Sequence, residues 1–352
     1  MTSPEKIVRP EIQALKAYHV PPAKGMVKLD AMENPYGLPE ALRKELAAVL
    51  ARVELNRYPE PASQRLLDLI RQKMGVPAGM AVQLGNGSDE LLQNIAIAVA
   101  KPGAVAMYPA PTFVMYSMYA TYFGMKGVAV PLREDFSFDA PAFIARMREE
   151  NPAVVFIAYP NNPTGVLYPE EDLAAVVRAA PGLVVIDEAY HAFAQKSFMP
   201  RLAEFPNLVV LRTVSKLGLA GIRLGYLAGR KEWLEQFDKV RSPYNINVLT
   251  EAAAVFLLER VEVLEQQAAE IRKERETLAR ALAALTGLTV YPSQANFLLI
   301  RVPDADRSFA DLLRQRVLVK NLNGPAMKNC LRVTVGTPDE NRILLRALKE
   351  AL

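Results

Sequence analysis

Short runs of apolar residues alternate with longer amphipathic stretches through the first two thirds of the chain. The short runs are rich in β-branched residues and continuously apolar, which is typical of parallel strands buried on both faces. They predict strands over Ala104–Tyr108, Ala153–Tyr159, Leu183–Asp187, Leu208–Thr213 and Gly225–Ala228. Apolar residues at helical spacing predict helices between them, over Glu90–Ala100, Ala140–Glu150 and Pro169–Ala179. This alternation indicates an α/β fold with a mostly parallel sheet.

The pattern changes near residue 250. From Glu251 to Leu285 there is neither Gly nor Pro, and the helical spacing predicts one long helix that links two domains. Beyond it we expect strands over Leu288–Tyr291, Asn296–Arg301, Val317–Lys320 and Cys330–Val335, and a helix near Ser308–Arg314. We therefore predict an arm over residues 1–29 that packs on the small domain or on a partner subunit, a large domain over residues 30–245, and a small α+β domain over residues 246–352.

Composition and charge narrow the class of protein. The chain has 352 residues, of which 51% are hydrophobic, so it can bury a sizeable core. The net charge is only +4 and no basic run occurs, which disfavours a nucleic-acid or membrane-surface protein. Cys330 is the single cysteine and there are two histidines, which argues against disulfides and a Cys/His metal site. Since the first residues lack the apolar core of a signal peptide, we expect a cytoplasmic protein.

The segment after the apolar run Leu208–Leu211 contains a candidate for covalent chemistry. Lys216 follows this predicted strand, beside Ser215 and ahead of a Gly-containing loop that ends at Arg223. A partly desolvated lysine keeps a neutral amine that can form a Schiff base with a carbonyl group. Ser215 and Arg223 can hold a phosphate, because the guanidinium presents a fixed cationic fork. The alternative is a surface lysine in a Gly-rich loop.

A carboxylate ends the wholly apolar strand predicted over Leu183–Asp187. Ligands collect at the carboxyl ends of strands in open α/β sheets, and a buried Asp187 needs a cationic partner such as a pyridinium nitrogen. Tyr190 follows three residues later and can donate a hydrogen bond to a phenolate oxygen. The alternative is that Asp187 caps the next helix.

Two further loops carry polar groups directly after or before predicted elements. Asn162 lies in the turn Tyr159–Gly165, after an apolar strand, where its amide can donate to a ring oxygen. Ser88 and Asp89 follow Gly87 at the start of a predicted helix, where free backbone N–H groups form a phosphate cup. The alternatives are a generic loop and an ordinary helix cap.

With these residues the chain resembles the fold-type I aminotransferases, which use pyridoxal 5′-phosphate (PLP), and within them the histidinol-phosphate aminotransferase family. The resemblance covers nearly the whole chain. It rests on Leu29–Gly37, Arg57–Pro59, Gly87–Glu90, Asn161–Gly165, Asp187–Tyr190, Ser215–Arg223 and Asn329–Gly336. It implies a large domain with a mostly parallel, seven-stranded sheet and a smaller α+β domain.

The resemblance also implies how the cofactor is bound. Lys216 would carry PLP as a Schiff base and move the proton between the substrate Cα and the cofactor C4′. Asp187 would pair with the pyridinium nitrogen, and Asn162 and Tyr190 would bind the ring oxygen O3′. The other implied cofactor contacts are Phe113 stacked on the ring and, around the phosphate, Ser88, Asp89, Ser215, Arg223 and Tyr58 of the partner subunit. A homodimer with shared sites is therefore implied.

On the substrate side, the resemblance implies that Arg332 grips the carboxylate of glutamate or 2-oxoglutarate. Tyr18 and Asn34 would complete the substrate pocket, and Lys320 would meet the phosphate of histidinol phosphate. The implied reaction is ping-pong transamination between histidinol phosphate and 2-oxoglutarate.

The chain departs from the wider pattern at three places. Lys216 and Arg223 are seven residues apart (223 − 216), one fewer than in aspartate aminotransferases. Phe113 stands where many relatives have tyrosine, and Lys320 where a second arginine is common. Rival functions on the same fold are an aromatic amino-acid aminotransferase and a threonine-phosphate decarboxylase. A PLP-binding regulator is a non-enzymatic alternative, but the segment before Leu29 is too short for a helix-turn-helix domain.

Overall fold

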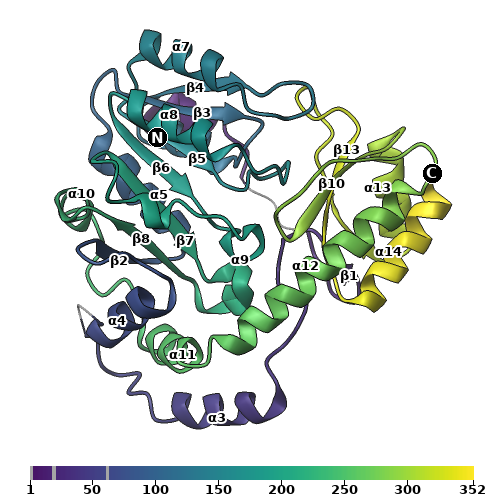
Figure 1. Cartoon of the computed structure of the whole chain (residues 1–352), viewed down its shortest axis with the longest axis horizontal. Helices are drawn as coiled ribbons and strands as arrows, with labels where there is room; N and C mark the ends of the chain where they lie inside the picture. Colours follow the sequence, from purple (N-terminus) through teal and green to yellow (C-terminus); the bar gives the residue numbers. More distant parts are fainter. Residues whose placement is uncertain (1–2, 18–20, 61–62) are drawn as a thin grey trace.

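A seven-stranded sheet forms the centre of the computed structural model, which describes residues 3–17, 21–60 and 63–352 (Figure 1). The strands lie in the order β2-β8-β7-β6-β5-β3-β4. Their bounds are β2 (Ala81–Asn86), β3 (Val105–Ala110), β4 (Lys126–Pro131), β5 (Val154–Ala158), β6 (Leu183–Asp187), β7 (Leu208–Thr213) and β8 (Leu224–Gly229). Strand β8 is antiparallel to β2 and β7, whereas the other pairings are parallel. The predicted α/β fold with a mostly parallel sheet is confirmed.

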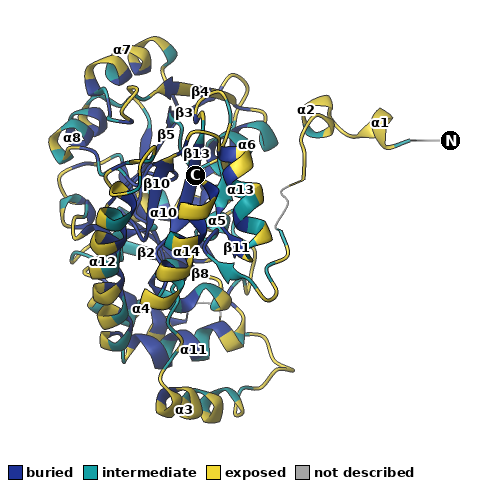
Figure 2. Ribbon diagram, turned by 90° about the vertical axis from the view of Figure 1, so that its right-hand side faces the viewer, coloured by how far each residue is buried: buried dark blue, intermediate teal, exposed yellow. Residues whose placement is uncertain are grey.

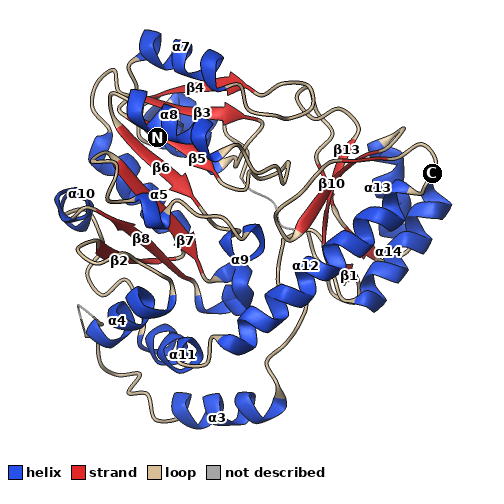
Figure 3. Ribbon diagram, viewed as in Figure 1, coloured by secondary structure: helices blue, strands red, loops and turns tan. Residues whose placement is uncertain are grey.

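Helices cover both faces of this sheet (Figure 3). On one face lie α5 (Ser88–Val99), α6 (Met115–Tyr122) and α10 (Lys231–Asp238), and on the other α4 (Gln64–Lys73), α7 (Ala140–Glu150), α8 (Glu170–Ala179) and α11 (Val248–Leu258). Successive residues of β5 point to opposite faces of the sheet. Val155 and Ile157 pack on the α7 side, and Phe156 packs on the α6 side. Burial on both faces explains the continuously apolar runs, since each fully buried Val, Leu or Ile contributes about 1.5–3 kcal/mol.

A second, four-stranded sheet lies in the C-terminal part, in the order β12-β13-β10-β9. It comprises β9 (Thr289–Val290), β10 (Phe297–Arg301), β12 (Lys320–Asn321) and β13 (Cys330–Thr334), and packs with α13 (Ala305–Arg314) and α14 (Pro338–Ala351). The single strand predicted over Val317–Lys320 is wrong. β11 (Val317–Leu318) instead pairs in parallel with β1 (Val27–Lys28), and the chain then turns to pair β12 with β13. Different partners on either side of Val319 divide the strand.

The prediction of a single long helix over Glu251–Leu285 is also wrong. The chain forms α11 and then α12 (Glu262–Ala283), with a turn over Glu259–Val261. Helix α11 packs on α4 and on α3 (Glu40–Leu50), whereas α12 runs in another direction, towards α14 (Figure 1). The two helices are therefore separated because they pack against different sets of helices. No Gly or Pro at this point of the sequence marks the end of α11.

The N-terminal segment leaves the body of the molecule (Figure 2). Its two short helices, α1 (Pro4–Ile7) and α2 (Pro10–Gln13), are exposed, and Arg9 donates a hydrogen bond to the carbonyl of Tyr122 on α6. The segment returns as β1 beside the C-terminal part. The domain boundaries given above stay a prediction. Among the described residues no helix is long and apolar enough to cross a membrane.

Candidate active site

A cavity opens at the edge of the large sheet where strands β3, β5, β6 and β7 end. These strands are parallel, so the segments that follow them meet at one edge. The antiparallel strand β8 begins at this same edge, which brings the residue before it, Arg223, to the cavity. The lining residues are Met32, Ser88, Asp89, Phe113, Ala158, Asn162, Asp187, Ala189, Tyr190, Thr213, Ser215, Lys216 and Arg223. Nine of these were predicted from the sequence as site residues, whereas Met32, Ala158, Ala189 and Thr213 were not.

Lys216 lies in the short helical turn η2 (Ser215–Leu219), directly after β7. Its Nζ donates a hydrogen bond to the carbonyl of Ala31 at 3.0 Å. Burial and, to a smaller extent, the positive charge of Arg332 lower the pKa of Lys216 to about 8, while Glu33 acts in the opposite direction. A lysine amine with this pKa is partly neutral at neutral pH, so it can act as a nucleophile and as a base.

We expect Lys216 to react with aldehydes at lower pH than the surface lysines do. Only the neutral amine reacts, and the neutral fraction grows as pH rises through the pKa. Reductive methylation by formaldehyde, read by peptide mass spectrometry, should reach half its maximal rate near pH 8 at Lys216. Lys231 has a side chain that is 75% exposed and is the control in the same digest. A lysine in a short reference peptide, with a pKa of about 10.4, should keep gaining rate towards about pH 10. Identical profiles would contradict the shifted pKa.

Asp187 ends β6 and is nearly fully buried. Its Oδ1 accepts the backbone N–H of Ala189 at 3.0 Å, and its Oδ2 accepts the hydroxyl of Tyr116 at 2.8 Å. Burial raises the pKa of Asp187 to about 6, although both hydrogen bonds lower it. The alternative that Asp187 caps the next helix is not what the structure shows, because α9 (His191–Ala194) has no side-chain cap.

A candidate anion site lies between the start of α5 and the loop before β8. Ser88 is the first residue of α5, and no side chain caps this helix in the described chain, so the capping alternative does not hold. Arg223 approaches Ser215 Oγ at 3.4 Å and Asp89 Oδ2 at 3.7 Å. A Cβ at Gly225 would lie 2.5 Å from the backbone nitrogen of Ser88, so the close approach requires glycine. A helix N-terminus beside a guanidinium is an anion site.

Arg332, which does not line the cavity, makes a hydrogen bond to the cavity residue Asn162. Arg332, on β13, donates from Nη1 to Asn162 Oδ1 at 2.5 Å and from Nη2 to the carbonyl of Asp30 at 2.9 Å. Because its oxygen accepts from Arg332, the NH₂ group of Asn162 is directed elsewhere. Tyr190 lines the cavity, and its ring meets the edge of Phe297 at a centroid distance of 5.2 Å. Lys320 pairs with Arg332 across the antiparallel strands β12 and β13, which places the two side chains on one face.

Four of the described residues that were predicted for the site do not line this cavity, namely Arg332 and Lys320, described above, and Asn34 and Tyr58. Asn34 donates instead to the carbonyl of Leu217 at 3.0 Å and to Gln267 at 2.9 Å, so its amide holds the loop beside Lys216. Tyr58 is 80% exposed, and its ring stacks on Tyr244 at 4.6 Å. Tyr18 lies outside the described residues.

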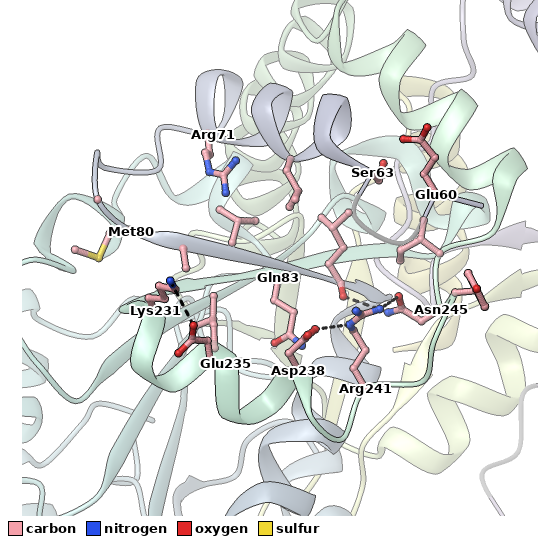
Figure 4. A pocket seen from close by; sticks show the side chains of 18 residues that line it. Glu60, Ser63, Arg71, Met80, Gln83, Lys231, Glu235, Asp238, Arg241 and Asn245 are labelled. Atoms are coloured by element: carbon pink, nitrogen blue, oxygen red, sulfur yellow. Dashed lines mark hydrogen bonds and ion pairs between the residues drawn. The ribbon is translucent and has the colours of Figure 1, made fainter. Parts of the chain in front are cut away.

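A larger hollow lies away from this cavity, along the free edge of β2 (Figure 4). It is lined by α4, α10 and the loop before α11, and its rim carries the ion pairs Lys231–Glu235 and Arg241–Asp238. None of the predicted site residues lines it. The size of a hollow therefore does not identify the candidate active site of this molecule.

The cavity of Lys216 has the donor set for a flat, phosphorylated ring with a basic nitrogen. One end can hold an anion, the anchored carboxylate of Asp187 can pair with a cationic nitrogen, and Phe113 offers an aromatic face. Lys216 adds an amine for a carbonyl carbon. The residues present therefore fit PLP, the cofactor that the sequence resemblance implied.

The chain belongs to the aminotransferase class I and II family, whose family profile matches residues 24–348. Two relatives that are 58% identical are histidinol-phosphate aminotransferase 2 of Cupriavidus pinatubonensis and histidinol-phosphate aminotransferase 2 of Burkholderia pseudomallei. The alignment covers 99% of this chain and 97% of the first relative, and 100% of both chains for the second. The crystal structure of histidinol-phosphate aminotransferase from Sinorhizobium meliloti in complex with pyridoxal-5′-phosphate is similar with a TM-score of 0.87. It is 26% identical, and the match covers 98% of this chain and 97% of that one.

Proposed function

We propose that this chain is a PLP-dependent histidinol-phosphate aminotransferase that exchanges an amino group between L-histidinol phosphate and 2-oxoglutarate. The observation that carries the proposal is one cavity that contains a lysine amine with a pKa of about 8 and a doubly hydrogen-bonded aspartate. The near-complete coverage at 58% identity to relatives of that name supports the substrate. We also propose that the enzyme works in histidine biosynthesis, as the name of these relatives suggests, and in the cytoplasm, as the sequence predicts.

When bound, PLP supplies an electron-withdrawing ring that stabilises negative charge at the substrate Cα. Lys216 Nζ would hold the cofactor covalently until the substrate amine replaced it. As a neutral amine it would then accept the proton from the substrate Cα and return a proton on the cofactor side. Asp187 would hold the ring nitrogen, and Ser88, Ser215, Arg223 and the backbone of Asp89 would hold the phosphate at the helix N-terminus.

The other polar groups orient the ring and the substrate. Asn162, whose oxygen accepts a hydrogen bond from Arg332, would donate from its NH₂ group to the ring oxygen, and Tyr190 would donate to the same oxygen. Arg332 grips the carboxylate of glutamate in one half-reaction, and Lys320 meets the phosphate of histidinol phosphate in the other. Asn34 acts through its hydrogen bond to Leu217 and holds the Lys216 loop.

Steady-state assays with each donor test the proposed substrate. L-histidinol phosphate should have a kcat/KM at least about tenfold above that of phenylalanine, since one additional charged contact contributes roughly 1.4 kcal/mol or more. O-phospho-L-threonine should release no carbon dioxide. Higher kcat/KM with phenylalanine, or release of carbon dioxide without an oxo acceptor, would overturn the substrate in favour of the aromatic aminotransferase or the decarboxylase.

Replacing Lys320 should separate the two substrates. Lys320→Met keeps the length of the side chain but loses its charge, so KM for histidinol phosphate should rise about tenfold with little change in kcat. KM for glutamate should change less, because Arg332 remains. Lys320→Arg should stay near the wild type, and Lys328→Met removes an exposed lysine as the matched control. An unchanged KM for histidinol phosphate in Lys320→Met would remove Lys320 from the substrate site.

We further propose a homodimer in which Tyr58 of the partner subunit completes each cofactor site. The support is the exposure of an apolar group of side chains on one chain, at a distance from its own cavity. These are Leu55 at 71%, Tyr58 at 80%, Tyr244 at 43% and Leu249 at 41% exposure. Exposed aromatic patches of this kind mark protein interfaces.

Hybrid dimers test whether Tyr58 acts across the interface. Tyr58→Phe should weaken PLP binding about tenfold through loss of a charge-assisted hydrogen bond. A hybrid of one Lys216→Ala subunit and one Tyr58→Phe subunit contains one intact site only if Tyr58 acts in trans. We then expect about half of the wild-type turnover per dimer at limiting PLP, because one site of each hybrid is intact. Turnover no higher than half that of the Tyr58→Phe homodimer at the same PLP concentration would place Tyr58 in its own subunit's site.

A further inference from the structure

Tyr116, on α6, contacts Asp187 from a fully buried position. Its hydroxyl lies 2.8 Å from Asp187 Oδ2, and the residue is 0% exposed. The ring stacks parallel to Phe156 of β5 at a centroid distance of 5.1 Å and meets the edge of Phe113 at 5.6 Å. Tyr116 is thus packed between the sheet and the aromatic side chain of the cavity, and these contacts fix the direction of its O–H group.

The carboxylate of Asp187 needs this donor because its burial opposes its negative charge. Its two oxygens are held differently: a backbone N–H from Ala189 reaches Oδ1, and the Tyr116 hydroxyl reaches Oδ2. Burial and the neighbouring charge of Asp187 raise the pKa of Tyr116 well above its ordinary value. Tyr116 therefore stays protonated and remains a donor over the whole working pH range.

We propose that Tyr116 is a positioning residue that keeps the shared proton on the ring nitrogen of the cofactor rather than on Asp187, an inference that rests on the proposed PLP function. The pair of Asp187 and the ring nitrogen holds one proton. It lies either on the nitrogen, facing a carboxylate, or on Asp187, facing a neutral ring. A hydrogen bond donated to Oδ2 stabilises the carboxylate and so favours the protonated nitrogen. The protonated ring withdraws electrons more strongly, which is what proton removal from the substrate requires.

Tyr116→Phe tests the proposal, because it removes one oxygen and keeps the ring that packs on Phe156. Wild-type and Tyr116→Phe holoenzymes are prepared with PLP that carries ¹⁵N in the ring, and the ¹⁵N chemical shift of each is measured by NMR. In the wild type the nitrogen should resonate as a protonated ring, and in Tyr116→Phe it should shift towards the neutral-ring position. The dissociation constant for PLP should rise about tenfold or more, and kcat should fall more than KM for glutamate changes.

The matched control is Tyr168→Phe. Tyr168 is as buried as Tyr116, at 2% exposure, but its hydroxyl has no hydrogen-bond partner among the described residues. This variant should leave the ¹⁵N resonance and the PLP affinity at their wild-type values. If Tyr116 served only in packing, Tyr116→Phe would lower the thermal stability and leave the ¹⁵N resonance unchanged. That result would overturn the proposal.

A ring-fluorinated tyrosine at position 116 covers the case in which Tyr116→Phe does not fold. It is a stronger donor of nearly the same shape, so the protonated-ring resonance should persist to a higher pH than in the wild type, and an unchanged pH dependence would overturn the proposal. In the Asp187→Asn background, Tyr116→Phe should have no further effect on PLP affinity. A wild-type protein that binds no PLP would defeat the proposed function and this inference together. A wild type with a protonated ring, unaltered in Tyr116→Phe, would defeat the inference alone.

Discussion

Lys216→Ala is expected to lower the rate of transamination by about 10⁴-fold or more, since the variant loses both the covalent bond and the proton transfer. The fold should be retained, because Lys216 makes a single described hydrogen bond, to the carbonyl of Ala31. Because burial disfavours the charged amine, the wild-type apoprotein should lose stability as the pH falls from 10.5 to about 8. The Lys216→Ala apoprotein should lack this loss. Steady-state turnover and circular dichroism of the same preparation measure both effects.

The control for this variant is Lys231→Ala, which removes an exposed lysine on α10 that pairs with the exposed Glu235. Its turnover should equal that of the wild type. Full turnover in Lys216→Ala, with the fold intact, would show that the covalent lysine is another residue.

Asp187→Asn is expected to lower kcat by roughly 10²- to 10³-fold, because breaking a buried charge pair costs about 3–5 kcal/mol. Asparagine has the same shape, but it has no negative charge for the ring nitrogen. It also has one oxygen for the two donors, Tyr116 and the Ala189 N–H, that Asp187 now accepts. PLP affinity and kcat, both measured at saturating glutamate, report the loss.

Asp238→Asn is the matched control, because Asp238 is 56% exposed and pairs with Arg241 at the surface, away from the cavity. We expect no change in its PLP affinity or kcat. If Asp187→Asn kept wild-type kcat, the ring nitrogen would have another partner and the orientation of the cofactor given above would be wrong.

The sheet was predictable because burial on both faces leaves continuous apolar runs. The bounds predicted for Leu183–Asp187 and Leu208–Thr213 match β6 and β7. Strands at the sheet edge were missed: β4 is exposed at alternate positions, and β2 mixes polar Gln83 with glycine, so neither shows an apolar run. The turn between α11 and α12 was missed because tertiary packing on either side produces it.

The candidate site was predictable where a polar residue directly follows an apolar strand, as Asp187 and Lys216 do. Residues that act through packing left no such signal. Tyr116 lies on an aromatic helix, and only the structure shows that its hydroxyl reaches Asp187 across 71 positions of sequence. Asn34 was predicted from its motif to contact substrate, whereas its described hydrogen bonds join the chain to itself.

An absorbance spectrum of the purified protein, taken before and after addition of L-histidinol phosphate, tests the proposed function as a whole. We predict a band of lysine-bound PLP that shifts when L-histidinol phosphate is added and returns on addition of 2-oxoglutarate. If the band is unchanged by L-histidinol phosphate but shifts with glutamate, the protein is an aminotransferase and the proposed substrate is wrong. No band after incubation with PLP would contradict the proposed cofactor and the role of Lys216.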